Sequence, residues 1–545
     1  MSTIDCLIVG NNQMQFPEYA ATLRAMGPKS GAYRDLRLSY YRDDSGEVVT
    51  CRDFCNRREG SHALEMSYDD ILSATIAYLG TFLHRHGFSF GYVNSFQEGK
   101  ADLERTLRAH DVGVVAITTT YYVSPLPLLQ VVEFVRTLDP DVKIVVGGPL
   151  VRTQHQIHAP ASFEFLLRQI GADFYVVSDQ GEQTLVNLLA AIRSGAGYRA
   201  IPNLIYKENG GYVSNTFAPE DNDLTRNLVD WTLFATDARP TRRRMVMART
   251  ARSCPFACAF CSFPAHAGAY RYLDPVDIWR ELDQVEALGC VNSVTFIDDT
   301  FNVPLQRFEQ ILHGLCERRY SFRWNCNFRC QYATPEVVAL MKASGCEGVF
   351  LGLESGSDAV LKNMNKSATA NDYRRGVAML REAGILTYGS FIIGFPGETP
   401  GTVRETIDFI EEAAPDFFRA QLWYYDTMTP VHRDAAKYGL RNSQFEWSHH
   451  TMQSEEAAEW VDYLHGNIKS SVWLPQNDFD FPSLFCLLSR GWTRQGITEV
   501  VRTFNRRVLL GLGGTAVPDD SAYLDRQLLR GSGFGFDDDC SPGAS

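Results

Sequence analysis

Apolar runs rich in β-branched residues alternate with helix-forming segments along most of this chain of 545 residues. In the first half, the runs stand at 88–93, 112–117, 142–148 and 174–177. Strands that are apolar throughout and are joined by helices form parallel sheets that are buried on both faces. The pattern therefore predicts a doubly wound, Rossmann-like α/β domain over residues 68–200.

A second series of strands and helices follows. Its strand candidates are 245–248, 293–297, 322–328, 348–353, 386–393 and 417–423, with helical segments such as 275–288, 335–343 and 402–413 between them. Six β/α units of this kind predict a partial TIM-like barrel, (β/α)6, over residues 242–430.

The remaining segments flank these two units. We expect residues 1–67 to be an N-terminal extension packed on the first domain. Residues 201–241, with an Asn-Gly-Gly turn signal, are expected to form a hairpin and linker. Residues 431–545 form the predicted C-terminal region, which is mostly helical. Its end, from Gly511, is rich in Gly, Asp and Ser and is predicted to be mobile.

Three cysteines close together follow the first strand of the second series. Cys254, Cys258 and Cys261 have the spacing Cys-x3-Cys-x2-Cys, with Phe260 just before the last thiol. One short loop with this spacing brings three thiolates around a cubane iron–sulfur cluster and leaves the fourth iron without a protein ligand. An open iron binds a small molecule and passes it an electron, so the loop predicts redox chemistry on a bound cofactor.

Two other metal sites fit the sequence less well. His266, just after the cysteine loop, would complete a tetrahedral Cys3His zinc site, but structural zinc sites usually space their ligands in pairs. Two further cysteine pairs, Cys51 with Cys55 and Cys326 with Cys330, supply too few ligands for a second cluster.

Small and hydroxylated residues follow the strands of the first domain. In doubly wound sheets, ligands bind beyond the carboxyl ends of the strands, where such residues let a bulky cofactor approach the backbone. Ordinary strand-to-helix turns and caps explain the same residues equally well. The absence of a Gly-x-Gly-x-x-Gly sequence from this domain argues against NAD or FAD. The candidate cofactor contacts are Thr118, Thr119, Thr120, Tyr121, Gly147, Gly148, Ser178, Gly181 and Glu182.

The ends of the barrel strands are unusually polar. Active sites of barrels gather at the carboxyl ends of the strands. Carboxylates and amides there suit a ligand with an amine and ribose hydroxyls, and an arginine suits its carboxylate. Helix capping is the better explanation for Ser357 and Asp358. The candidate contacts are Asp298, Asp299, Arg329, Glu354, Ser355 and Gly394.

Composition argues against several classes of protein. A net charge of −13 is unlike that of nucleic-acid-binding proteins, which depend on a basic surface. No apolar run approaches the roughly 20 residues of a membrane helix, and the first residues lack the basic start of a signal peptide. The 13 cysteines fit a reducing compartment as thiols or metal ligands. We therefore predict a cytoplasmic protein with no membrane or nucleic-acid partner.

From Arg242 to Asp426 the chain resembles the radical S-adenosylmethionine (radical SAM) superfamily, on its cysteine spacing and on Phe260, which matches the aromatic residue of that pattern. The resemblance implies that the three cysteines hold a [4Fe-4S] cluster, whose open iron binds the amine and carboxylate of SAM. Reductive cleavage of SAM then yields a 5′-deoxyadenosyl radical. The residues implied to hold SAM are Phe260, Asp298 or Asp299, Arg329, Glu354 and Ser355, with the backbone near Gly394.

A doubly wound domain ahead of such a barrel resembles the cobalamin-binding subclass of these enzymes. That resemblance implies cobalamin at the strand ends of the first domain. The Asp-x-His-x-x-Gly motif of cobalamin mutases is absent there, so no histidine is expected below cobalt. The Gly-Gly-Pro-His turn of the subclass appears as Gly-Gly-Pro-Leu at 147–150, a second departure.

Residues 5–14 and 26–36 resemble the P-methyltransferase family of phosphinothricin tripeptide (bialaphos) biosynthesis. The resemblance implies two SAM molecules, one that methylates cob(I)alamin to methylcobalamin and one that supplies the radical. The radical takes hydrogen from an H-phosphinate resembling N-acetyl-demethylphosphinothricin, and the phosphorus then takes the methyl group. Such a substrate needs cationic partners, of which we expect at most two. The candidates are Arg242, Arg243, Arg244, Arg252, Arg271 and Arg419.

Other functions fit the same architecture. The main alternative is a C-methyltransferase that acts on an unactivated carbon of another natural product. A non-catalytic cobalamin- or metal-binding regulator would leave the polar rim and the open cluster without a purpose. Methylthio transfer to RNA would need a basic C-terminal module, which is not evident in this sequence. For either methyltransferase we expect an external electron donor such as flavodoxin or ferredoxin.

Overall fold

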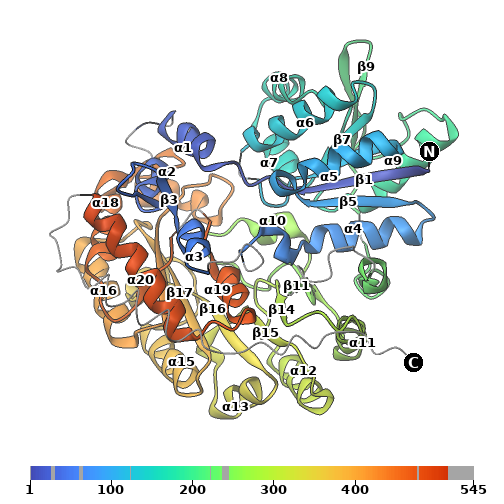
Figure 1. The fold of residues 1–545 in the computed structure, drawn as a ribbon. Coiled ribbons are helices and arrows are strands. Elements are labelled where there is room, and N and C mark those ends of the chain that lie inside the picture. Colours follow the sequence, from blue (N-terminus) through green and yellow to red (C-terminus); the bar gives the residue numbers. More distant parts are fainter. Residues whose placement is uncertain are drawn as a thin grey trace.

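The computed structural model describes residues 2–25, 27, 31–59, 65–122, 124–220, 222–235, 245–475 and 478–512. A seven-stranded sheet and an eight-stranded sheet, each with helices packed on it, form two bodies that lie side by side (Figure 1). The predicted mobile tail falls almost entirely outside the described residues.

The seven-stranded sheet confirms the predicted doubly wound domain. Its order is β10-β9-β8-β7-β6-β1-β5, with a parallel block from β8 to β5 and an antiparallel hairpin, β9 and β10, at one edge. Alternate side chains of β1 enter different cores, with Cys6 and Ile8 on one face and Leu7 and Val9 on the other, so both faces are buried. The elements of this Rossmann domain are β1 (Thr3–Asn11), α4 (Ala74–Arg85), β5 (Phe90–Ser95), α5 (Phe96–Ala109), β6 (Asp111–Thr118), α6 (Leu126–Leu138), β7 (Lys143–Gly147), α7 (Pro149–Ile157), α8 (Pro160–Ile170), β8 (Phe174–Val176), α9 (Glu182–Ser194), β9 (Leu204–Glu208) and β10 (Gly211–Ser214).

The position of β1 corrects the expected domain boundary. β1 lies inside the sheet, between β5 and β6, so the Rossmann domain takes in residues 3–11 and does not begin at residue 68. The chain then leaves the sheet and returns to it with α4 and β5. Local sequence could not reveal this, because the strands that pair with β1 stand far from it along the chain.

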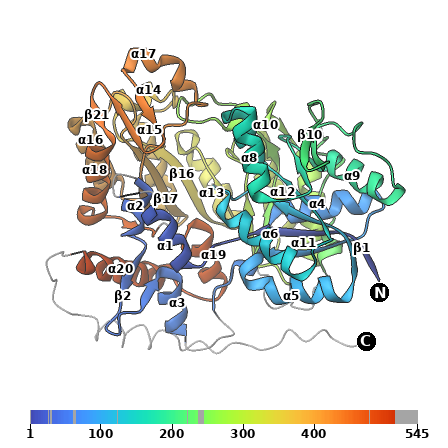
Figure 2. The same cartoon turned by 90° about the horizontal axis from the view of Figure 1, so that it is seen from above.

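The segment between β1 and α4 packs largely on the other body. Arg37 forms an ion pair with Asp462 at 3.0 Å, and Arg34 Nη1 donates to the carbonyl oxygen of Glu455 at 3.1 Å. Figure 2 shows α1, α2 and α3 beside the C-terminal helices. The described residues between 12 and 67 are thus mainly an extension of the second body and not of the first. Their elements are α1 (Phe16–Ala25), α2 (Gly31–Leu36), β2 (Tyr40–Arg42), β3 (Val48–Thr50) and α3 (Cys51–Glu59).

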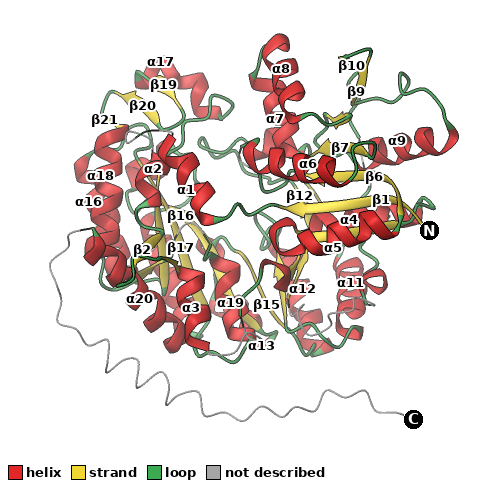
Figure 3. Cartoon of the chain, turned by 45° about the horizontal axis from the view of Figure 1, so that its top comes forward, coloured by secondary structure: helices red, strands yellow, loops and turns green. Residues whose placement is uncertain are grey.

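The eight-stranded sheet confirms the partial barrel. All its strands are parallel, in the order β22-β18-β17-β16-β15-β14-β11-β4, and helices cover its outer face (Figure 3). The six predicted strands form its middle, and short strands from the N-terminal and C-terminal segments add an edge on each side. The elements are β4 (Ile71–Leu72), β11 (Met245–Ala248), β12 (Ala251–Arg252), α10 (Phe263–Ala267), β13 (Arg271–Tyr272), α11 (Pro275–Ala287), β14 (Ser293–Phe296), α12 (Leu305–Arg318), β15 (Arg323–Asn327), α13 (Pro335–Ala343), β16 (Cys346–Glu354), α14 (Asp358–Asn363), α15 (Ala370–Glu382), β17 (Leu386–Ile393), α16 (Pro400–Ala413), β18 (Phe417–Leu422) and β22 (Val472–Trp473).

The C-terminal region is mostly helical, as predicted, and packs against the barrel. Phe481, at the start of α19, lies 5.8 Å from Phe350 of β16 between ring centroids. Arg490, just after α19, forms a buried ion pair with Asp70 at 2.6 Å and so joins the region to the segment before α4. Its elements are α17 (Ala435–Tyr438), β19 (Arg441–Ser443), β20 (Glu446–His449), β21 (Met452–Gln453), α18 (Ser454–Asn467), α19 (Phe481–Ser489) and α20 (Arg494–Gly511). No helix in the described ranges has the length and apolar character needed to cross a membrane.

A buried carboxyl group in α11 makes stability depend on pH. Burial raises the pKa of Glu281 to about 7, although Trp231 Nε1 donates a hydrogen bond to it at 3.3 Å. A raised carboxyl pKa favours the folded state fully below the unfolded value of 4.5, and this contribution is lost as pH rises through 7. Between pH 5 and 8, wild type should lose roughly 2–3 kcal/mol more free energy of unfolding than Glu281→Gln, as measured by urea unfolding. Equal losses in the two proteins would contradict the assignment.

Candidate functional site

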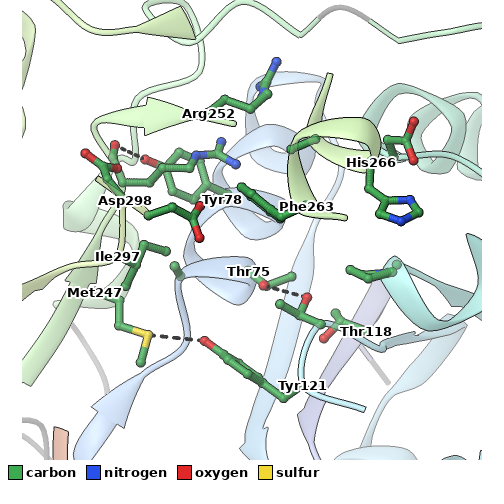
Figure 4. A pocket seen from close by; sticks show the side chains of 18 of the residues that line it. Thr75, Tyr78, Thr118, Tyr121, Met247, Arg252, Phe263, His266, Ile297 and Asp298 are labelled. Atoms are coloured by element: carbon green, nitrogen blue, oxygen red, sulfur yellow. Dashed lines mark hydrogen bonds between the residues drawn. The ribbon is translucent and has the colours of Figure 1, made fainter. Parts of the chain in front are cut away.

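A large cavity lies where the two bodies meet (Figure 4). Its volume of about 1020 Å³ is at the upper end for small-molecule sites. The ends of β6, β7 and β8 and the first turns of α4 line it from the Rossmann domain, and β11 and β14 to β18 line it from the barrel. Strand ends of both sheets therefore face one space that is large enough for more than one ligand.

The cysteine loop borders this cavity. Cys261 lines the cavity, and Cys258 is buried behind it, where Arg329 Nη2 donates to its Sγ at 3.4 Å. The Sγ of Cys254 lies 3.6 Å from the hydroxyl oxygen of Thr300. Donors beside the thiols suit thiolates that carry negative charge in a cluster.

The three thiols are not arranged for a single metal ion. Within the described ranges, no three His, Cys, Asp or Glu side chains gather closely enough to hold one ion. A cubane allows wider spacing, because each thiolate binds a different iron. Burial raises the pKa of Cys261 to about 11, so this thiol stays protonated until a metal displaces the proton. The loop thus fits a cluster better than it fits the zinc alternative.

Comparison with known families accounts for both halves of the cavity. Residues 249–410 match the radical SAM superfamily, and residues 64–189 match the B12 binding domain. The chain is an enzyme with a B12-binding domain and a radical SAM domain. Its cofactors are a [4Fe-4S] cluster, SAM and cobalamin, as the sequence predicted.

Individual proteins are also similar to this chain. An anaerobic magnesium-protoporphyrin IX monomethyl ester cyclase from Rubrivivax gelatinosus is 27% identical over 361 residues, which are 63% of this chain and 62% of that protein. An uncharacterized methyltransferase from Pyrococcus horikoshii is 27% identical over 324 residues, 58% of this chain and 68% of that protein. The aligned part of this chain therefore spans about three fifths of the cyclase's length.

A solved structure shares the whole fold. The radical SAM methyltransferase TsrM from Kitasatospora setae, with cobalamin and a [4Fe-4S] cluster bound, superposes with a TM-score of 0.61 at 17% identity. The match covers 94% of this chain and 100% of that one. At this level of identity the likeness concerns the fold.

The Rossmann side of the cavity fits a bulky cofactor. Most of the contacts predicted for cobalamin line the cavity, namely Thr118, Thr120, Tyr121, Gly147, Gly148, Gly181 and Glu182. Thr119 and Ser178 do not line it. The hydroxyl of Thr119 donates to the carbonyl oxygen of Gly147 at 2.9 Å, and that of Ser178 accepts from the backbone of Gln180 at 3.3 Å. These two residues shape the strand ends, while the others are exposed to the cavity.

Glycine is required at one point of this wall. Gly148 has φ of 110°, and a Cβ there would lie 2.9 Å from Thr119 Oγ1. Gly148→Ala should weaken cobalamin binding by roughly tenfold or more, because it strains the turn that the cofactor approaches. Titration with hydroxocobalamin, followed by absorption, measures this affinity.

The matched control is Gly171→Ala. Gly171 also has positive φ, 76°, but a Cβ there would meet nothing within 4 Å. This variant should bind cobalamin as wild type does. Equal affinity in both variants would remove the turn at Gly148 from the cofactor site.

Asp298 and Asp299 have different surroundings at the end of β14. Both line the cavity, as does Phe260. Asp298 is buried and accepts hydrogen bonds from the backbone of Thr250 at 2.7 Å and of Ala251 at 2.9 Å, so it holds the turn that leads into the cysteine loop. The side chain of Asp299 is exposed to the cavity. Desolvation by the surrounding protein and then the charge of Asp298 raise its pKa to about 6. Asp299 is thus the better candidate to contact SAM.

Two further predicted SAM contacts lie near the cysteine loop but do not line the cavity. Arg329 contacts Cys258, as described above, and its guanidinium lies 3.4 Å from the ring centroid of Phe256. Glu354 forms a buried ion pair with Lys366 at 2.7 Å. Lys366 was not predicted, because it follows α14 in a loop and belongs to no motif.

The other two predicted SAM contacts, Ser355 and Gly394, have local structural roles. Ser355 accepts a hydrogen bond from the backbone of Ser357 at 3.1 Å, and Gly394 has φ of 94° where a Cβ would lie 2.4 Å from Trp447. Neither lines the cavity, nor do Arg329 and Glu354. Contact between SAM and these four residues stays a prediction.

Sequence reasoning missed several groups that line the cavity, among them Thr75, Tyr78 and Met247. Tyr121 donates its hydroxyl to Met247 Sδ at 3.4 Å, which joins the two bodies across the cavity, and Thr75 lies 3.0 Å from Thr120 between hydroxyl oxygens (Figure 4). Thr75 and Tyr78 belong to the first turns of α4, which resembled an ordinary helix in sequence. Only the position of α4 between the two sheets brings them to the site.

The arginines predicted to bind an anionic substrate differ in their position relative to the cavity. Arg252 and Arg419 line the cavity, whereas Arg271 is exposed and does not line it. The other candidates, Arg242 to Arg244, lie outside the described residues. Two of the predicted arginines thus remain as candidates to bind an anionic ligand, in a cavity that Arg152 and Arg249 also line.

Proposed function

We propose that this enzyme is a cobalamin-dependent radical SAM methyltransferase. The observation that carries the proposal is the shared cavity, in which the strand ends of the B12-binding domain face the barrel and its cysteine loop. A methyl donor and a radical source must reach one substrate in succession, and one enclosed space allows this.

The chain's own residues position and enclose these cofactors. When bound, the cluster with SAM supplies a radical that abstracts hydrogen, and cobalamin supplies the methyl group. Cys254, Cys258 and Cys261 hold the cluster, and Arg329 donates a hydrogen bond to one of these thiols. Walls from both bodies keep water from the reacting groups.

We propose the phosphorus of an H-phosphinate, resembling N-acetyl-demethylphosphinothricin, as the methyl acceptor. Support comes from the resemblance of residues 5–14 and 26–36 to the P-methyltransferases. It also comes from Arg252 and Arg419, because an arginine in a cavity suits an oxyanion.

Anaerobic reconstitution tests both levels of the proposal. The protein is loaded with iron, sulfide and cobalamin and is incubated with SAM, a chemical reductant and N-acetyl-demethylphosphinothricin. We expect 5′-deoxyadenosine by chromatography and a P–CH3 product by phosphorus NMR, both dependent on cobalamin. Methylation at a carbon of the probe would replace the phosphorus acceptor by the carbon alternative. Failure to bind cobalamin would refute the proposal that the enzyme is a cobalamin-dependent methyltransferase.

A further inference from the structure

One end of the cavity lies inside the barrel, on the far side from the cysteine loop. Phe350 of β16 pairs in register with Tyr388 of β17, and Arg419 is on the next strand, β18. All three line the cavity. In the sheet, four strands separate β18 from β11, the strand that leads to the cysteine loop.

Aromatic rings surround this end. Phe350 lies 5.0 Å from Tyr388 and 5.8 Å from Phe481 between ring centroids, and Tyr388 lies 5.8 Å from Phe481. Such a wall buries the apolar part of a small molecule. It also lowers the local polarity, so a charged group here interacts strongly with an opposite charge on a ligand.

The guanidinium of Arg419 is held in place at this end. The amide oxygen of Gln421, in the orientation that satisfies both groups, accepts from Arg419 Nε at 2.7 Å and from Nη2 at 2.9 Å. Arg419 also shares a hydrogen bond with Tyr388. An arginine fixed in this way loses little side-chain entropy when it binds an anion.

Nearby carboxyl groups neutralise the charge of Arg419 only in part. Burial raises the pKa of Asp35 to about 7, although the charge of Arg419 opposes this, so Asp35 is only partly ionised at neutral pH. Asp480 lines the cavity, but one of its oxygens caps α19 by accepting from Ser483. The positive charge of Arg419 is thus offset in part by Asp35 and in part by the carboxylate of Asp480, one oxygen of which is engaged in the cap.

We propose that Arg419 anchors an anionic group of the methyl acceptor, distinct from the atom that is methylated. Because the cysteine loop follows β11, which four strands separate from β18 in the sheet, an anchor here lets the rest of the molecule extend toward that loop. The inference rests on the proposed function and deepens it, in that the substrate class is a small molecule with an oxyanion on an apolar stem. For an H-phosphinate amino acid, the anchored group is the carboxylate.

The test compares binding of two probes to the reconstituted holoenzyme by calorimetry. The probes are N-acetyl-demethylphosphinothricin and its carboxamide, which lacks the carboxylate charge. Wild type should bind the acid at least about tenfold more tightly. Arg419→Gln should lose about 10- to 100-fold affinity for the acid and little for the amide, and Arg419→Lys should retain part of the preference. Iron content and the cobalamin spectrum should stay unchanged in both variants.

Arg271→Gln is the matched control, because Arg271 is exposed and does not line the cavity. It should bind both probes as wild type does. The anchor is overturned if Arg419→Gln keeps the preference for the acid, or if wild type fails to distinguish the probes. Acid binding that depends on Arg419 without methyl transfer would refute the proposed acceptor and keep the anchor. Methyl transfer with an unchanged KM in Arg419→Gln would refute the anchor and keep the proposed acceptor.

Discussion

Replacing Cys258 with alanine should remove the visible absorption of the reconstituted cluster and abolish both 5′-deoxyadenosine formation and methyl transfer. Cys258 is the most buried of the three thiols and receives the Arg329 hydrogen bond, so no water or neighbouring side chain replaces its sulfur readily. A cubane with two remaining ligands is not retained. Iron analysis and absorption spectra after anaerobic reconstitution measure the loss.

Cys316→Ala is the control for this experiment. Cys316 lies in α12, outside the cysteine loop, where its thiol donates to the carbonyl oxygen of Leu340 at 3.7 Å. Iron content and turnover should match wild type. A Cys258→Ala protein that keeps both cluster absorption and turnover would refute the assignment of the cysteine loop.

Replacing Asp70 with alanine should lower the free energy of unfolding by about 3–5 kcal/mol. Asp70 pairs with Arg490 at 2.6 Å, and the two side chains are 6% and 8% exposed. Asp70 also accepts a hydrogen bond from the backbone of Ser67 at 2.6 Å. Its loss leaves a guanidinium buried without its carboxylate, at the junction of the N-terminal and C-terminal segments. Urea unfolding of the apoprotein measures the change.

An exposed ion pair provides the comparison. Arg375 pairs with Asp372 at 2.7 Å, but its side chain is 65% exposed. Arg375→Ala should change the free energy of unfolding by about 0–1 kcal/mol, because solvent screens such pairs. If Asp70→Ala lowers the free energy of unfolding by no more than Arg375→Ala does, the buried pair does not hold the two segments together.

The sequence predicted most of the local structure correctly. The apolar runs and the helices between them reported both parallel sheets, because strands buried on two faces and helices with one apolar face leave distinct patterns. The central position of β1 was not predicted, because its pairing with β5 and β6 joins segments that are distant along the chain. The short edge strands β4 and β22 were not predicted either, because they too pair with segments that are distant along the chain.

The candidate site divides in a similar way. The cysteine spacing and the polar strand ends were readable, because a loop or a strand end holds its residues close together whatever surrounds it. The sequence did not show whether a polar residue faces a ligand or supports its neighbour. Asp298 and Asp299 are adjacent in sequence and both line the cavity, yet the first is buried and holds a turn, whereas the second is exposed. Thr119 and Thr120 differ in the same manner.

By itself, the sequence determined the two α/β units, the cluster loop and the classes of cofactor. These depend on contacts between residues that are near one another along the chain. The tertiary structure decided that both units open onto a single cavity, that α4 and Phe481 help to line it, and that Arg419 lies at its inner end. Those relations depend on how distant segments pack, because the free energy that fixes them comes from burial between elements and not from local spacing.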